Sequence, residues 1–268
     1  MRIFSLLLLG WAGGACRAAP VMEPIGSFTL APASAHEWRE ASVAELEGWM
    51  VAAEKAVGGL RDYRATLESS ERIEDELFPR RVMTVWVLHE PLHVAIVTHE
   101  PESERGQKVW YEGEERELVA ETPGFLGTLV GRVSLDPEGD LAMQNRRHPI
   151  TDIGLARMVE QMRAALEPVL ALSTTLRIRS GEARLAERDV RLVEVLVPAI
   201  EAHETALVYR FAFDRELGLL IYYGQAELTS EGPAVLEEYL YREITPNLGL
   251  DEDDFAPGTT PGESKAED

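Results

Sequence analysis

The sequence predicts an α+β protein in which one antiparallel sheet is combined with two helices. In the second half of the chain, apolar and polar residues alternate, most clearly from Leu207 to Phe213, as expected for strands with one buried face. Residues 42–60 and 151–170 instead repeat apolar residues at helical spacing. Short turns separate the later strands, so they are expected to form an antiparallel meander.

The amino terminus has the layout of a secretory signal: one basic residue, an apolar run from Ile3 to Trp11, and small residues. Cleavage after Ala18 would remove the only cysteine, whereas Cys16 could instead be the lipidated first residue of a lipoprotein. Both routes predict a periplasmic or outer-envelope protein. Residues 1–18 are assigned to the signal peptide, and residues 19–41, rich in Ala and Pro, to a linker.

The composition excludes several classes of function. The chain has 47 acidic and 26 basic residues and a net charge of -21, which argues against nucleic-acid binding. No P-loop, dinucleotide fingerprint or G-x-S-x-G motif occurs, so no cofactor and no catalytic residue are expected. His93 and His99 lie about 20 Å apart along an extended strand, too far to share an ion, and no metal site is predicted.

The domain, predicted over residues 42–255, begins with a helix that Ser42 and Glu45 start as a capping box. Strands are then predicted at 63–73, 81–89, 92–99, 108–112 and 117–120. The second and third of them are apolar on both faces. Their sheet must therefore be covered on each side, either by helices or by its own curvature around an interior.

Residues 123–133 interrupt this pattern with three glycines spaced between apolar residues. The segment could be a short helix or loop packed on the core. Alternatively, its glycines could make it a mobile apolar flap, with Phe125 and Leu129 in contact with a ligand. Both interpretations stay open.

The central stretch, residues 135–166, combines a turn, a polar cluster and a helix. Pro149 favours an extended conformation before it, and Thr151 is the expected N-cap of a helix that ends near Leu170. Ile150 and Leu155 have the spacing of a hydrophobic staple. The helix has one apolar stripe, which should lie on a wide apolar surface: Leu155, Met158, Val159, Met162 and Leu166.

The polar cluster consists of Asn145, Arg146, Arg147 and His148. Two guanidiniums and an imidazole just before a helix amino terminus could bind the phosphate or carboxylate of a ligand headgroup. In so acidic a chain, the same arginines could instead pair with internal carboxylates. The sequence leaves both alternatives open.

Beyond the central helix, strands are predicted at 174–179, 183–197, 205–214, 219–228 and 235–244. Asp251 can cap a last short turn that returns Phe255 to the core. The residues after it, 256–268, are acidic and rich in Pro and Gly, and a disordered tail is expected.

The central stretch also resembles an uncharacterised bacterial envelope family with the pattern L-D-P-x-G-x-L-A-M followed by N-R-H-P-I-T. Leu135-Asp136-Pro137, Leu141-Ala142-Met143 and residues 145–151 carry the resemblance, and residues 239–255 are similar to the end of that family's pattern. The layout is in turn similar to that of the periplasmic lipoprotein carrier LolA. This resemblance implies a strongly curved sheet, an incomplete barrel, whose concave face is plugged by the central helix.

The leading functional hypothesis is a non-enzymatic envelope protein that holds a lipid, an acyl chain or a lipoprotein-like apolar ligand in the half-barrel. Its predicted contacts are Arg146, Arg147, His148, Phe125, Leu129, Met158 and Met162. The alternative is a structural module with a filled core that contacts another envelope protein. An enzyme without a known motif ranks third. A cavity of roughly 300 to 1,000 Å³ favours the first hypothesis, and a solid core the second.

Overall fold

The computed structural model describes residues 28–29, 35–113, 116–123, 131–170, 176–199 and 205–262. Its strands are β1 (His36–Glu40), β2 (Asp62–Ile73), β3 (Glu76–Leu77), β4 (Arg81–Leu88), β5 (His93–Glu100), β6 (Lys108–Glu112), β7 (Glu117–Glu121), β8 (Arg132–Leu135), β9 (Arg177–Leu185), β10 (Arg188–Val197), β11 (Ala206–Asp214), β12 (Leu220–Thr229) and β13 (Gly232–Pro246). The α-helices are α1 (Val43–Val57) and α3 (Leu155–Leu170), and short 3₁₀ turns are η1 (Ile150–Asp152) and η2 (Glu252–Phe255).

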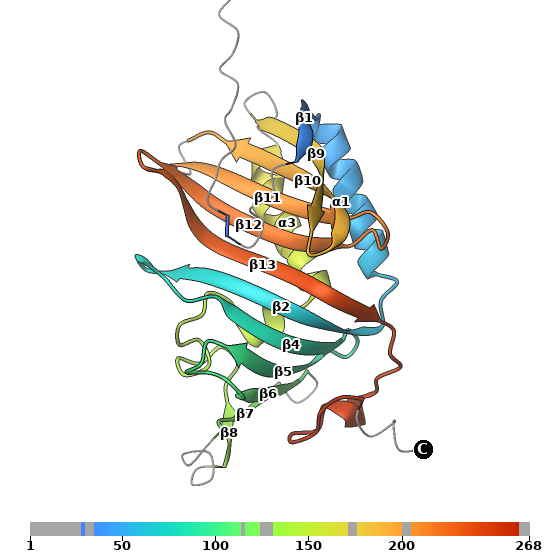
Figure 1. Cartoon of the computed structure of the whole chain (residues 1–268). Helices are drawn as coiled ribbons and strands as arrows, with labels where there is room; N and C mark the ends of the chain where they lie inside the picture. The colour runs from blue at the N-terminus through green and yellow to red at the C-terminus, as the bar shows by residue number, and fades with distance from the viewer. Residues whose placement is uncertain are drawn as a thin grey trace, which may run out of the picture.

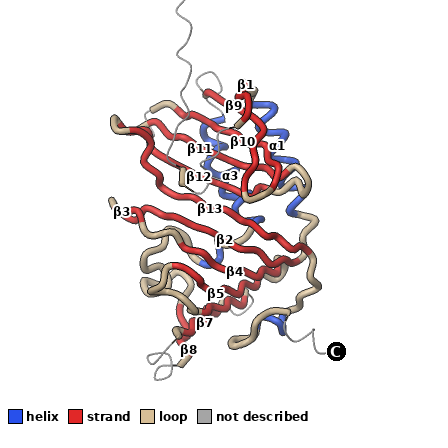
Figure 2. Tube along the Cα trace, in the orientation of Figure 1, coloured by secondary structure: helices blue, strands red, loops and turns tan. Residues whose placement is uncertain are grey.

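The strands form one 13-stranded sheet in the order β1-β9-β10-β11-β12-β13-β2-β4-β5-β6-β7-β8, with β3 beside β2. The long strands pair antiparallel throughout, including the last strand, β13, with the early strand β2. The sheet curves without closing, and α1 and α3 lie on its concave side (Figures 1 and 2). The predicted α+β fold, with a curved antiparallel sheet and two helices, is confirmed.

The two faces of the sheet are covered by different parts of the chain. On β4, Met83, Val85 and Val87 join the main core on the helix side. Trp86 and Leu88 point the other way, into a second apolar cluster that includes Leu250 and Phe255 from the C-terminal segment. The side chains of this strand are therefore buried on both faces. Along β4–β7, the C-terminal segment therefore covers the face of the sheet opposite the helices.

Helix α3 buries the predicted stripe completely. Leu155, Met162 and Leu166 are 0% exposed, and Met158 and Val159 are 3% exposed. The predicted start of the helix at Thr151 was wrong, because Ile150–Asp152 form a separate 3₁₀ turn and α3 begins at Leu155. Gly154 separates the two with a φ of +129°, a conformation that favours glycine.

Three further boundaries differ from the sequence predictions. The stretch 183–197 is not one strand but two, joined by a two-residue turn at Ala186 and Glu187, whose φ angles are 48° and 65°. The predicted linker contains strand β1, which pairs with β9. The predicted disordered tail is ordered up to residue 262. Within it, Thr259 O accepts a hydrogen bond of 3.0 Å from Trp110 Nε1.

The linker prediction also missed Phe28, which is 2% exposed and packs edge-on against Tyr222.

The signal peptide and Cys16 lie outside the described residues. Among the helices that the structure does describe, none is long and apolar enough to cross a membrane.

Candidate functional site

A row of polar side chains crosses the concave face of the sheet, in a region otherwise made of apolar and aromatic residues. Glu71 on β2 is paired with Glu237 on β13, Glu237 with Gln225 on β12, and Gln225 with Tyr209 on β11. Glu71 and Glu237 are 6% and 5% exposed. Two carboxylates directly opposite each other repel, so this arrangement requires cations or donors nearby.

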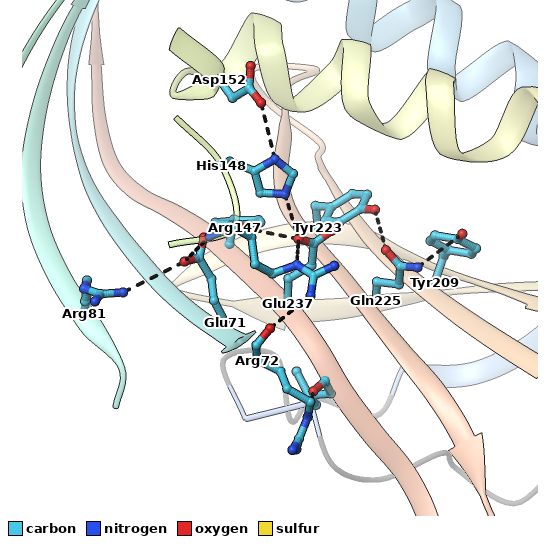
Figure 3. A network of polar contacts seen from close by, with 12 residues as sticks. Glu71, Arg72, Arg81, Arg147, His148, Asp152, Tyr209, Tyr223, Gln225 and Glu237 are labelled. Atoms are coloured by element: carbon cyan, nitrogen blue, oxygen red, sulfur yellow. Dashed lines mark hydrogen bonds and ion pairs between the residues drawn. The ribbon is translucent and has the colours of Figure 1, made fainter. Parts of the chain in front are cut away.

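The segment before α3 supplies them (Figure 3). Arg147 Nε lies 3.1 Å from Glu237 Oε2, and its backbone N–H donates to Glu71 Oε2 at 3.3 Å. His148 Nε2 lies 2.9 Å from the same Glu237 oxygen, while its Nδ1 faces Asp152 Oδ2 at 3.3 Å. Arg147 and His148 therefore bridge the carboxylates of Glu71 and Glu237 and fix the segment before α3 to the sheet.

Two side chains of the sheet complete the network around Glu71. The hydroxyl of Tyr239 donates to Glu71 Oε1 at 2.6 Å. Arg81, which is 4% exposed, lies 3.9 Å from Glu71 and binds Glu104 through two hydrogen bonds of 3.0 and 3.2 Å. Charge-assisted bonds of this kind stabilise buried carboxylates in the ionised form.

These contacts shift the acidity of the central pair in opposite directions. Burial acts to raise the pKa of Glu237, but the hydrogen bond and charge of His148, together with Arg147, lower it below its usual value. Burial acts to lower the pKa of His148, but the hydrogen bond to Glu237 and the charges of Glu237, Glu71 and Asp152 raise it. Each ion therefore stabilises the other.

Two backbone N–H groups at the amino terminus of α3 are already bound to side chains of the sheet. The backbone N–H of Gly154 donates to the hydroxyl of Tyr241 at 2.9 Å, and that of Leu155 donates to the hydroxyl of Tyr63 at 2.8 Å. Both tyrosines are buried. These two N–H groups are therefore satisfied by hydroxyl groups from the sheet, and a ligand headgroup at the polar cluster would have to be bound by its side chains.

Arg146 differs from its two neighbours. Within the described part of the chain, no carboxylate oxygen lies within the 4.0 Å ion-pair distance of its guanidinium and no hydrogen bond reaches it. Its backbone N–H donates to Met143 O at 3.0 Å. Burial and the charge of Arg81 lower the pKa of Arg146, against the opposing effect of Glu104 and Glu71.

Arg146 lines a cavity of about 240 Å³ at the β8 end of the sheet. The cavity lies between strands β5–β8 and the segment 137–153. Its apolar lining is Ile96, Val109, Leu118, Ala120, Leu135, Pro137, Leu141, Ala142, Ile150 and Ile153. Its polar lining is Thr98, Glu104, Gln107, Gln144, Asn145, Arg146 and His148. The lining therefore combines an apolar part, which could hold a chain, with a comparable polar part, which could hold a headgroup.

The structure brings together only part of the predicted contact set. Arg146 and His148 line both the 240 Å³ cavity and a small neighbouring one of about 40 Å³, which Met158 also lines. Met162 lines neither, because it is buried in the core under α3. Phe125 and Leu129 lie outside the described residues.

The residues His89 to His93 spell H-E-x-x-H, a pattern that binds zinc when it lies on a helix. Here His89 and Glu90 lie in the turn between β4 and β5. His93 is buried with its Nδ1 3.0 Å from Pro91 O and its ring against Phe255. Among the described residues, no group of three metal-ligating side chains converges. The hairpin separates the two histidines that a helix would place on one face.

Comparison with known proteins identifies the family. Residues 60–261 match the family described as "Protein of unknown function (DUF1571)". The chain belongs to this family. The match covers most of the sheet, helix α3 and the polar network, so these features are parts of a DUF1571 domain. No curated protein matches the chain.

Solved structures with a similar arrangement differ widely in sequence. The Mycobacterium tuberculosis lipoprotein LppX has a TM-score of 0.44 and 10% identity, and the similarity covers 78% of this chain and 99% of that one. A candidate outer membrane lipoprotein-sorting protein domain from Vibrio parahaemolyticus has a TM-score of 0.37 and 14% identity, over 78% and 97%. A DUF1329 family protein from Desulfovibrio piger has a TM-score of 0.35 and 13% identity, over 78% and 96%. At these values, the similarity says nothing about a ligand of this chain.

Proposed function

We propose that this DUF1571 protein is a non-enzymatic protein of the cell envelope that binds one apolar chain in the cavity between strands β5–β8 and the segment 137–153. The observation on which the proposal depends is the cavity itself, with Ile96, Leu118 and Ile150 in its lining. Burying such a chain gains about 0.8 kcal/mol for each CH₂ group removed from water.

The size of the cavity limits what it can hold. Its volume of about 240 Å³ falls just below the range of roughly 300 to 1,000 Å³ for ligand sites. It suits a single acyl chain better than a ligand with several chains. The ligand would lie beside α3 and not under it, which changes the placement expected from the sequence.

The packed core under α3 favours a second candidate, a structural or interaction module. Leu155, Met162 and Leu166 are completely buried, so the concave face is filled by side chains where the helix crosses it. A protein of this kind would bind no lipid, and its acidic exterior would contact another envelope protein.

Export through the predicted signal peptide, residues 1–18, is part of the proposal. A periplasmic or outer-envelope location would expose the protein to acyl chains of lipids or lipoproteins. No nucleic-acid partner is proposed, since the net charge of -21 repels phosphate backbones.

Native mass spectrometry of protein purified without detergent, followed by titration with dodecanol, tests the proposal. Ala142 lines the cavity, and Ala142→Trp should fill it and weaken dodecanol binding at least about tenfold. Val51→Trp serves as the control, because Val51 is 55% exposed on α1. Absence of any bound or added chain in the unmodified protein would favour the structural module.

A further inference from the structure

We infer that Arg146 is the headgroup anchor of this cavity and that the ligand is a single-chain amphiphile with a carboxylate at its end. The inference rests on the proposed function and names the class of ligand. Arg147 and His148, the other cations of the polar cluster, do not contribute, because Glu237 already binds both.

The first argument is the distribution of charge around Arg146. The two carboxylates that act on it at longer range are Glu71 and Glu104. Both are bound to other groups: Glu104 to Arg81 through two hydrogen bonds, and Glu71 to Arg81 and the Tyr239 hydroxyl. Arg146 therefore has no internal carboxylate of its own in the part of the chain that the structure describes.

An unpaired guanidinium that is partly buried has a desolvation cost. Such a charge is stabilised when an anion reaches it, and a guanidinium can donate two parallel hydrogen bonds to one carboxylate. Arg146 lines the 240 Å³ cavity directly. A carboxylate at this position would pair with the guanidinium while its chain extends along Ile96 and Leu118.

The surrounding charge selects for a ligand with a small anionic group. The whole chain has a net charge of -21, and Glu104 also lines the cavity. A group with a charge of -1 can be matched by the single guanidinium, whereas a doubly charged phosphate monoester would leave one negative charge uncompensated beside Glu104. A carboxylate therefore fits better than a phosphate monoester.

The test is a calorimetric titration of the mature protein with three probes. Dodecanoate has both parts of the proposed ligand, dodecanol has the chain alone, and acetate has the headgroup alone. We expect dodecanoate to bind most tightly and acetate not to bind measurably. Arg146→Met should weaken dodecanoate about tenfold or more and change dodecanol less than about threefold.

Two control variants separate the anchor from a general effect of charge. Arg146→Lys keeps the charge and should retain most of the preference for the acid. Arg105→Met removes an exposed arginine, 60% accessible and paired with Glu102, and should leave all three affinities unchanged. An equal loss of dodecanoate and dodecanol binding in Arg146→Met would overturn the inference, because it would indicate a structural role.

The failures of the two proposals are distinguishable in the unmodified protein. If neither dodecanoate nor dodecanol binds, the proposed function is wrong. If both bind equally, the apolar site stands and the carboxylate anchor is wrong.

A second measurement does not depend on the variants. For dodecanoate labelled with ¹³C at the carboxyl carbon, the NMR titration of the bound acid should show a pKa below that of the free acid, because the adjacent guanidinium favours the charged form. An unchanged or raised value would overturn the anchor.

Discussion

His148 Nε2 lies 2.9 Å from Glu237 Oε2 and so connects the segment before helix α3 to the middle of strand β13. Glu237 is 5% exposed and lies opposite Glu71, so His148 adds to Arg147 in compensating this buried pair of carboxylates. The contact therefore has two effects: it stabilises a buried pair of acids, and it holds one wall of the cavity in place.

The first prediction concerns pH. The folded-state pKa of His148 is raised above its ordinary value of 6.5, because the hydrogen bond to Glu237 and the charges of Glu237, Glu71 and Asp152 outweigh burial. Its contribution to stability should be fully present below about pH 6.5 and be lost as pH rises through the higher folded-state value. Urea unfolding of the unmodified protein at several pH values from about 6 to about 9 measures this loss.

The control is His148→Gln, which removes the titrating group. The difference in unfolding free energy between the two proteins should shrink as pH rises. Other histidines, such as His89, titrate in both proteins and cancel in the difference. A constant difference across the range, or an NMR titration of His148 with a midpoint below 6.5, would contradict the prediction.

The second prediction is that neighbouring arginines have opposite effects on stability. Arg147→Met should destabilise the protein by about 1 to 3 kcal/mol, since a hydrogen bond to the charged Glu237 is lost, and the 35% exposure of Arg147 keeps the cost below that of a fully buried pair. Arg146→Met should stabilise the ligand-free protein by about 1 kcal/mol, because it removes a partly buried charge that has no partner among the described residues. Chemical unfolding of both variants without ligand gives the comparison, and destabilisation of similar size in both would contradict it.

This contrast also shows what could be predicted from the sequence. The helices and most strands follow from periodicity, because a repeating pattern of burial directly reflects which side chains face the core. The placement of Arg147 over Glu71 and Glu237 depends on how β2 pairs with β13. That pairing joins residues far apart in the chain, and no local pattern encodes its register.

The missed boundaries have similar causes. Strand β1 is an edge strand whose pairing with β9 decides its structure, so Ala- and Pro-rich sequence around it indicated a linker. The turn at Ala186 and Glu187 has a left-handed backbone without Gly, Asn or Asp, the residues that usually signal such turns. Composition indicates the polar cluster, but only the structure distinguishes Arg147, which is paired with Glu237, from Arg146, which has no ion pair with any residue that the structure describes.

The third prediction tests the packing of α3. Met162 is 0% exposed and lies in the core between the helix and the sheet. Met162→Ala should cost about 2 to 5 kcal/mol, because it leaves a cavity in a packed core. Val51→Ala, at a position 55% exposed on α1, should change the unfolding free energy by less than about 0.5 kcal/mol. Similar small costs at both positions would show that α3 is not packed as described.

The fourth prediction concerns whether Cys16 carries a lipid. If Cys16 is the first residue of a lipoprotein, a palmitate analogue supplied to growing cells should label the protein, and Cys16→Ser should abolish the label. Cleavage after Ala18 instead predicts no label and a mature chain that starts at Ala19. Intact mass spectrometry of the exported protein distinguishes the two.

The fifth prediction concerns the segment that precedes the domain. Phe28 is buried against the face of the sheet opposite α3, with the guanidinium of Arg210 4.6 Å from its ring centre. Thr29 N donates to Glu238 at 2.8 Å. These contacts require Gly224 beneath the ring, because a Cβ atom there would come within 2.8 Å of Phe28 and would also meet the Tyr222 hydroxyl.

Gly224→Ala should therefore displace Phe28, lower the unfolding free energy by about 1 to 3 kcal/mol, and speed hydrogen exchange at the Thr29 amide. Gly48→Ala is the control, because a Cβ atom at Gly48 on helix α1 would meet nothing within 4 Å and should add up to about 1 kcal/mol of stability. In a Phe28→Ala background, Gly224→Ala should cost clearly less, since the ring it displaces is gone. If the costs are additive and Thr29 exchange does not change, the strain is relieved at Tyr222, and Phe28 does not hold the segment to the sheet.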